Sequence, residues 1–210
     1  MSLTIPDSVQ RSDLAAFVER ALRLDDAAVI RLRRRNDGLI AAWVNTGFDV
    51  LAVRVVAGEL GIADLSCGAD QLVRGLHAAD AAGHIDPGFS MDSAWRGVLP
   101  PDTGFVHVDD IPAAVLVDLG RRGADLAREH GSAGPPASLL DQDVLQVSSG
   151  ATAVGVPMRS VFALAAMGFV PESPSAEEIV RVRVLPAWLR IDARFGSVFR
   201  RRGDPALALR

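Results

Sequence analysis

Lysine and tyrosine are absent from the 210 residues, so all 22 basic residues are arginine. Such a bias is expected of a GC-rich genome, which avoids AT-rich codons. Without lysine the chain cannot form a Schiff base. It also lacks the phosphate-loop lysine of NTPases and the strand lysine of protein kinases. Without tyrosine it has no phenolic general acid.

Cysteine occurs once, at Cys67. An intrachain disulfide and a zinc site built from several thiolates are therefore excluded. The first 13 residues lack the basic and apolar pattern of a signal peptide, and no uncharged apolar run reaches the roughly 18 residues of a membrane span. We therefore expect a cytoplasmic protein with no membrane segment.

Hydrophobic residues make up 49% of the chain and charged residues 23%, which is typical of a globular protein. Residues 12–24 carry apolar side chains at helical spacing after a candidate N-cap, Ser12. Strand-like runs at 28–35 and 39–44 flank a turn in which Gly38 supplies the left-handed position. A third run at 49–56 completes a predicted antiparallel meander.

The middle of the chain alternates helices with irregular sequence. Ser66 is a candidate cap for a second helix with a buried stripe over 69–76. Residues 83–108 show little periodicity and predict a long loop. Asp109 and Asp110 precede Pro112 and predict the first turn of a third helix, which would end near 131.

A Gly- and Pro-rich segment, 131–138, predicts a linker between two units of 1–130 and 139–210 that are able to share one core. The second unit is expected to hold a hairpin of 143–149 and 153–158, a helix of 159–168, and strands at 180–184, 188–192 and 197–202. Helices and antiparallel strands come in separate groups, which predicts an α+β fold.

Charge is strongly segregated along the chain. Residues 57–110 carry nine acidic residues against two arginines, a net charge of −7. Residues 181–210 carry eight arginines against two aspartates, a net charge of +6. Because strand side chains alternate between faces, the arginines of several strands share one face. These are Arg31, Arg33 and Arg35, then Arg181 and Arg183, then Arg200 and Arg202.

These arginine faces have three interpretations. They are solvated faces paired with carboxylates of the same or a neighbouring subunit, a surface for phosphate or nucleic acid, or a docking surface for an acidic protein. The overall charge of −4 disfavours nucleic acid. Trp95 and Arg96 add a candidate contact surface in the long loop.

Four residues form a pool of candidate catalytic or metal-binding groups: Cys67, His84, His107 and Asp109. At a helix N-terminus Cys67 would have a lowered thiol pKa. His107 and Asp109 would share a strand face. No HxxxH, HxH or HExxH spacing supports a metal site, so we predict neither metal nor cofactor.

The sequence therefore favours a non-catalytic protein that acts by protein–protein association, as a homodimer whose acidic middle faces the arginine strands of its partner. One alternative is an enzyme with its site in the 83–110 loop. The other is a protein that binds nucleic acid or phosphate through the arginine faces.

Overall fold

The computed structural model describes residues 2–129 and 134–203. These residues form two compact units, one of residues 2–47 with 51–99 and the other of residues 48–50 with 100–129 and 134–203. The boundary falls between Leu99 and Pro100, whereas the sequence analysis placed a linker at 131–138. Residues 131–133 of that segment lie outside the described ranges.

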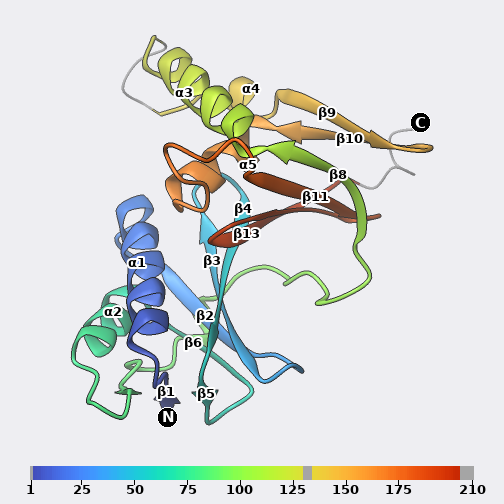
Figure 1. Ribbon diagram of the computed structural model, residues 1–210. Helices are drawn as coiled ribbons and strands as arrows, with labels where there is room; N and C mark the ends of the chain where they lie inside the picture. The colour runs from blue at the N-terminus through green and yellow to red at the C-terminus, as the bar shows by residue number, and fades with distance from the viewer. Residues whose placement is uncertain (1, 130–133, 204–210) are drawn as a thin grey trace. The chain divides into compact units, whose positions relative to one another are not determined.

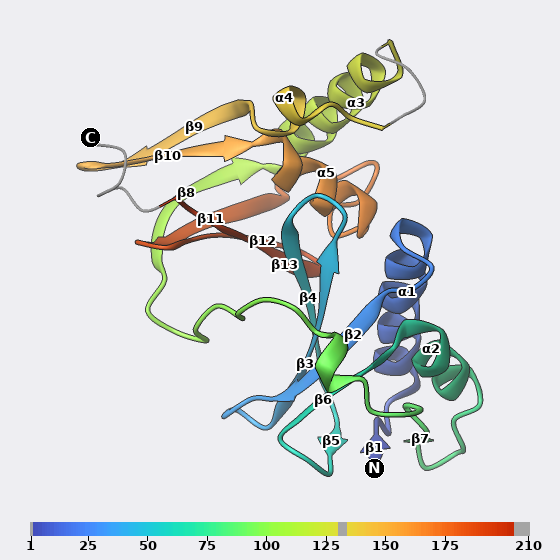
Figure 2. The same ribbon diagram turned by 180° about the vertical axis from the view of Figure 1, so that it is seen from behind.

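The first unit combines two helices with two groups of strands. Its elements are β1 (Leu3–Thr4), α1 (Ser8–Leu24), β2 (Val29–Arg34), β3 (Leu39–Thr46), β4 (Val50–Ala57), β5 (Glu59–Leu60), β6 (Asp64–Gly68), α2 (Ala69–His77), β7 (His84–Ile85) and a 3-10 turn, η1 (Asp92–Ala94). In this unit the larger strand group runs in the order β6-β2-β3-β4, and β1 pairs with β5 and β7. Helices α1 and α2 lie side by side against β2, β3 and β6 (Figures 1 and 2).

The second unit repeats this theme of two packed helices and antiparallel strands. Its elements are β8 (Val106–Pro112), α3 (Ala113–Glu129), α4 (Ala137–Leu140), β9 (Asp143–Ser149), β10 (Thr152–Pro157), α5 (Met158–Ala166), β11 (Ile179–Leu185), β12 (Trp188–Ala193) and β13 (Gly196–Arg201). Strands β13-β12-β11-β8 are neighbours in that order, and β9 pairs with β10. Helix α3 packs on α5 and on β8 (Figure 2). The predicted α+β class is confirmed.

Local sequence explains most of these elements. Gly38 closes the β2–β3 hairpin with φ at 81°, as expected, because only glycine adopts that conformation without strain. Alternating apolar residues bury one side of β2 and of β11; Ile30, Leu32 and Val182 are fully buried. The β9–β10 hairpin and the β11, β12 and β13 strands also lie where the sequence predicts them.

Three predicted helix starts are wrong. Helix α1 begins one turn earlier, and its cap is Asp7, whose carboxylate accepts the backbone N–H of Val9 at 2.7 Å. Helix α2 follows Gly68 without a side-chain cap, and Ser66 lies in β6. Asp109 and Asp110 lie in β8, and α3 starts only at Ala113.

Candidate functional site

Cys67 lies in β6, one residue before the strand ends, and is completely buried. Burial, together with the charges of Asp92 and Asp70, raises the pKa of its thiol to about 12. The expected position at a helix N-terminus is wrong, since α2 begins two residues later. At neutral pH this thiol is protonated and behaves as a small apolar side chain.

Each of the two candidate histidines is hydrogen-bonded to a nearby carboxylate at the surface. His84 Nδ1 lies 2.9 Å from Asp80, and His107 Nε2 lies 2.9 Å from Asp110. The bond to His84 is the main cause of a lowered pKa of Asp80. Within 2–129 and 134–203, no three His, Cys, Asp or Glu side chains gather as a metal site would require. Asp109 is exposed on β8 and accepts the backbone N–H of Asp110.

The arginine face of β2 is paired with carboxylates of its own unit. Arg31 donates to both oxygens of Asp64 on β6, at 2.8 and 2.6 Å. That hydrogen bonding raises the pKa of Arg31. Arg35 pairs with Asp37 of the adjoining turn at 2.8 Å. Arg33 makes no ion pair with any residue that the structure describes.

The arginines of the second unit are held in the same way. Arg183 and Arg190 both pair with Asp192, at 2.8 and 2.7 Å. Further partners are Asp110 for Arg181 at 3.6 Å, Asp141 for Arg200 at 3.5 Å, and the Leu185 carbonyl oxygen for Arg202 at 3.4 Å. Both strand groups therefore balance much of their positive charge within the chain.

Sequence reasoning missed two further arginine positions. The Arg190 guanidinium lies 5.5 Å from the Phe105 ring centroid and 5.3 Å from that of Phe199, close enough for a cation–π contact with each. Arg159 is buried at the start of α5, where it donates to the Phe48 carbonyl oxygen at 2.7 Å and to Asp141. No strand or helix periodicity marks these positions, since their partners come from distant segments.

The loop between β7 and η1 is tied to the first unit directly after Phe89. Ser90 pairs with Cys67 of β6 in an isolated antiparallel β-bridge, and the backbone N–H of Met91 donates to the Ser66 carbonyl oxygen at 2.7 Å. Asp92 accepts the backbone N–H of Ser66 at 2.7 Å. Phe89 itself is 83% exposed.

Trp95, a predicted contact residue, is only partly exposed. Its indole N–H donates to the Gly97 carbonyl oxygen at 3.2 Å, and the Arg31 guanidinium lies 5.7 Å from its ring. Arg96 is exposed beside it. The pair expected from sequence is thus divided, because Trp95 packs on an arginine of β2 while Arg96 faces solvent.

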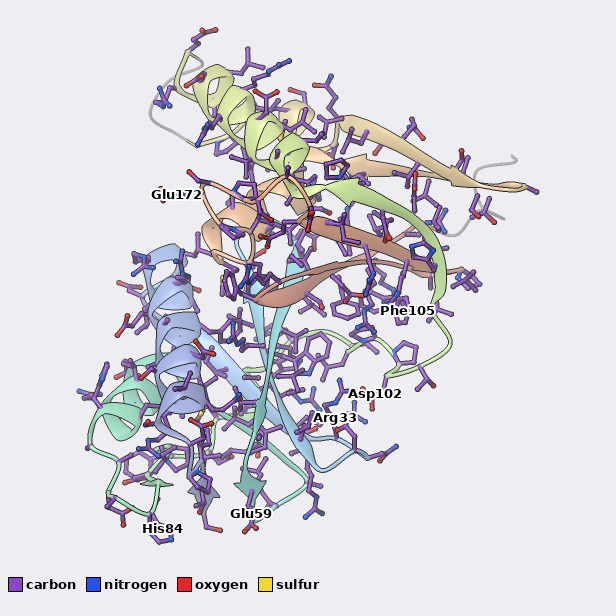
Figure 3. The ribbon with its side chains drawn as sticks, viewed as in Figure 1. Arg33, Glu59, His84, Asp102, Phe105 and Glu172 are labelled. Carbon is purple, nitrogen blue, oxygen red and sulfur yellow. The ribbon has the colours of Figure 1, made fainter. Side chains whose placement is uncertain are left out.

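An apolar groove of about 340 Å³ lies between α3 and α5 in the second unit. Its apolar lining includes Leu116, Gly120, Ala124, Val161, Ala165 and Pro171. At its rim Arg121 donates to the carbonyl oxygen of Glu172 at 3.1 Å, and Figure 3 shows Glu172 on the loop after α5.

The fold is similar to that of bacterial sliding clamps. The chain is similar to the DNA polymerase sliding clamp of Bacillus subtilis, with 15% identity, a TM-score of 0.59, and coverage of 96% of this chain and 64% of that one. The clamp of Bartonella birtlesii, a DNA polymerase III subunit beta, is 14% identical with a TM-score of 0.60, and the match covers 97% of this chain and 65% of that one. The pol III beta of Caulobacter crescentus is 14% identical with a TM-score of 0.57, and the match covers 99% of this chain and 67% of that one. The chain thus spans about two thirds of the length of these proteins.

Family models match both parts of the chain. Residues 1–97 match the family described as Domain of unknown function (DUF8010), and residues 100–205 match that described as Domain of unknown function (DUF8185). The second match covers half of the chain, and the protein belongs to the DUF8185 family. The comparison with curated proteins gives no match. None of the helices described is long and apolar enough to cross a bilayer.

Proposed function

We infer that this protein is a non-catalytic, cytoplasmic protein that works by associating with itself, as a homodimer, and with other proteins. The observation that carries this inference is the open apolar groove between α3 and α5. When a partner covers exposed apolar surface, the free energy of association becomes more favourable by roughly 25 cal/mol per Å². A concave groove of about 340 Å³ with a mostly apolar lining is typical of binding sites.

The charge pattern gives this association a particular character. Arg31 pairs with Asp64 and Arg181 with Asp110, so the acidic middle of the chain already meets two of the arginine strands within one chain. Arginines and carboxylates that already pair within one chain contribute little to binding between subunits. We therefore expect the association to depend on apolar burial more than on the charge complementarity first predicted, and to respond only weakly to salt.

Sedimentation equilibrium over a wide range of protein and salt concentrations tests this function. The expected result is a mass of twice 22.2 kDa that persists as the salt concentration rises. A single species of 22.2 kDa at every concentration would remove the homodimer from the proposal.

Nucleic-acid binding is a second candidate, favoured by the fold shared with DNA polymerase sliding clamps. Charge argues against it. Helix α1 carries three arginines against Asp13 and Glu19, and α3 carries equal numbers of arginines and carboxylates. A surface that binds phosphates needs uncompensated positive charge. Fluorescence anisotropy with labelled duplex and single-stranded DNA at low salt decides, since binding would appear there first and fall steeply as salt is added.

A further inference from the structure

Phe89 is an aromatic side chain held out in solvent by a fixed backbone. Its neighbours are anchored through the Ser90–Cys67 bridge and the Met91–Ser66 hydrogen bond. Gly88, on the other side, has φ of 83° and lies against Gln71 of α2, where a Cβ at Gly88 would overlap the Gln71 side chain. The backbone that carries the ring therefore loses little conformational entropy on binding, which favours affinity.

The α3–α5 groove offers a site that suits such a ring. Small residues, Gly120, Ala124 and Ala165, lie among its lining, so an inserted side chain can approach the helix backbones closely. Val161 and Leu116 supply the apolar contacts that a phenyl ring needs. A volume of about 340 Å³ accommodates one aromatic side chain together with its flanking backbone.

The charges beside the two features are complementary. Arg121, at the groove rim, donates to a carbonyl oxygen and pairs with no carboxylate in the described ranges. Asp86, three residues before Phe89, is exposed and accepts the Gly88 N–H at 2.9 Å. No arginine in the described part of the chain pairs with Asp86. Each feature thus carries a charge that the other can meet.

We propose that Phe89 of one copy inserts into the α3–α5 groove of a second copy, with Asp86 beside Arg121. In a closed two-fold dimer this contact forms twice, since each copy presents one Phe89 and one groove. The proposal rests on the homodimer proposed above and names the surfaces that form it.

Two substitutions test each side of the contact. Phe89→Ser removes the inserted ring, and Ala165→Arg blocks the groove; both positions are exposed, so neither change disturbs the core. Each is expected to raise the dimer dissociation constant about 30-fold or more. The matched controls are Val98→Ser, another exposed apolar residue of the first unit, and Ala114→Arg, an exposed position of α3 outside the groove. Both controls are expected to dimerise like the wild type.

Mixing the two variants gives the sharpest outcome. The Ala165→Arg copy keeps its phenylalanine and the Phe89→Ser copy keeps its groove, so an equimolar mixture restores one contact and forms a heterodimer. Misfolded variants would not recover in this way. If the wild type dimerises but either variant retains its affinity, or the mixture stays monomeric, this contact is wrong while the homodimer stands. If the wild type is monomeric throughout, both are wrong.

Discussion

The guanidinium of Arg31 is bound by both carboxylate oxygens of Asp64, at 2.8 and 2.6 Å, and the ring of Trp95 lies 5.7 Å from it. Asp64 stands opposite Arg33 in the strand register, so its bond to Arg31 is diagonal across the sheet. A two-point bond of this kind fixes the Arg31 side chain and neutralises its charge. One carboxylate of the acidic segment thereby neutralises one arginine of β2.

This relationship gives the first prediction. Asp64→Asn keeps the side-chain volume but leaves a half-buried guanidinium without its counter-charge, and is expected to lower the free energy of unfolding by about 1 kcal/mol. Urea unfolding with an unchanged m-value measures it. The control is Asp118→Asn, whose partner Arg122 is exposed on α3, with an expected loss of about 0.3 kcal/mol. Equal losses of stability in both variants would show that the Arg31–Asp64 ion pair contributes no more to folding than the exposed pair on α3.

Much of the fold follows from the sequence because its signals are local. The turn at Gly38 and the alternation of Ile30 and Leu32 both act within a few residues, and both predictions are confirmed. The start of α1 was missed because its first turn, from Ser8, carries no buried residue to mark the period. Asp7 was then the only signal.

The β8 strand was missed for a different reason. Its register shifts opposite Val182 and Arg183, so that Asp109 and Asp110 are both exposed in succession between buried Val108 and Ile111. A β-bulge breaks the two-residue period that identifies a strand. Two aspartates before a proline then read as a helix start.

The α3–α5 groove could not be predicted from the sequence because it depends on the packing of two helices that are far apart in the chain. The groove exists only because α3 packs on α5, which is separated from it by α4 and a hairpin. Phe89 gave a partial signal as an aromatic residue within a Gly- and Pro-rich loop. Its exposure follows from the Ser90–Cys67 bridge, which no local pattern predicts.

Cys67 provides the second prediction. With a pKa of about 12 and a fully buried side chain, its thiol is expected to react with a disulfide reagent such as Ellman's reagent only when the protein unfolds. At about pH 8, where a free cysteine begins to ionise, the native protein should stay unlabelled while the urea-denatured protein takes up one equivalent. Rapid labelling of the native protein would restore Cys67 as a candidate nucleophile.

Acid should release the Phe89 loop. The Ser90 hydroxyl and the Ser66 N–H hold the pKa of Asp92 below its usual value. A carboxylate with a lowered native pKa adds stability above its unfolded pKa of about 3.9 and loses it as the pH falls through the native value. Below about pH 4 the Ser66 amide should therefore lose protection, so that its exchange becomes faster relative to the intrinsic rate at the same pH.

Asp92→Asn separates this effect from general acid unfolding. The variant cannot ionise at this position, so its Ser66 amide should exchange faster than that of the wild type near pH 6 and change less on acidification. Asp26→Asn, an exposed position in the turn after α1, is the control and should follow the wild type. If the Asp92→Asn and wild-type profiles coincide, the loop is held by other contacts.

Two helix glycines should respond to alanine in opposite directions. A Cβ at Gly75 in α2 would overlap the Asp86 carbonyl oxygen and lie 2.9 Å from its carbon, and backbone atoms cannot move aside as a flexible side chain can. A Cβ at Gly120 in α3 would lie 3.7 Å from Val161 Cγ1 and 4.0 Å from Ala165 Cβ, which are ordinary contacts.

Gly120→Ala should therefore gain up to about 1 kcal/mol from helix propensity, whereas Gly75→Ala should lose about 1–3 kcal/mol to overpacking. Urea unfolding measures both, in the Phe89→Ser background so that association does not contribute. Because Asp86 begins the segment that presents Phe89, the Gly75→Ala variant should also show faster exchange of the Gly88 amide, which Asp86 binds. A Gly75→Ala variant as stable as its parent would mean that this segment shifts freely, and Phe89 would then lose the rigid support that makes it a docking residue.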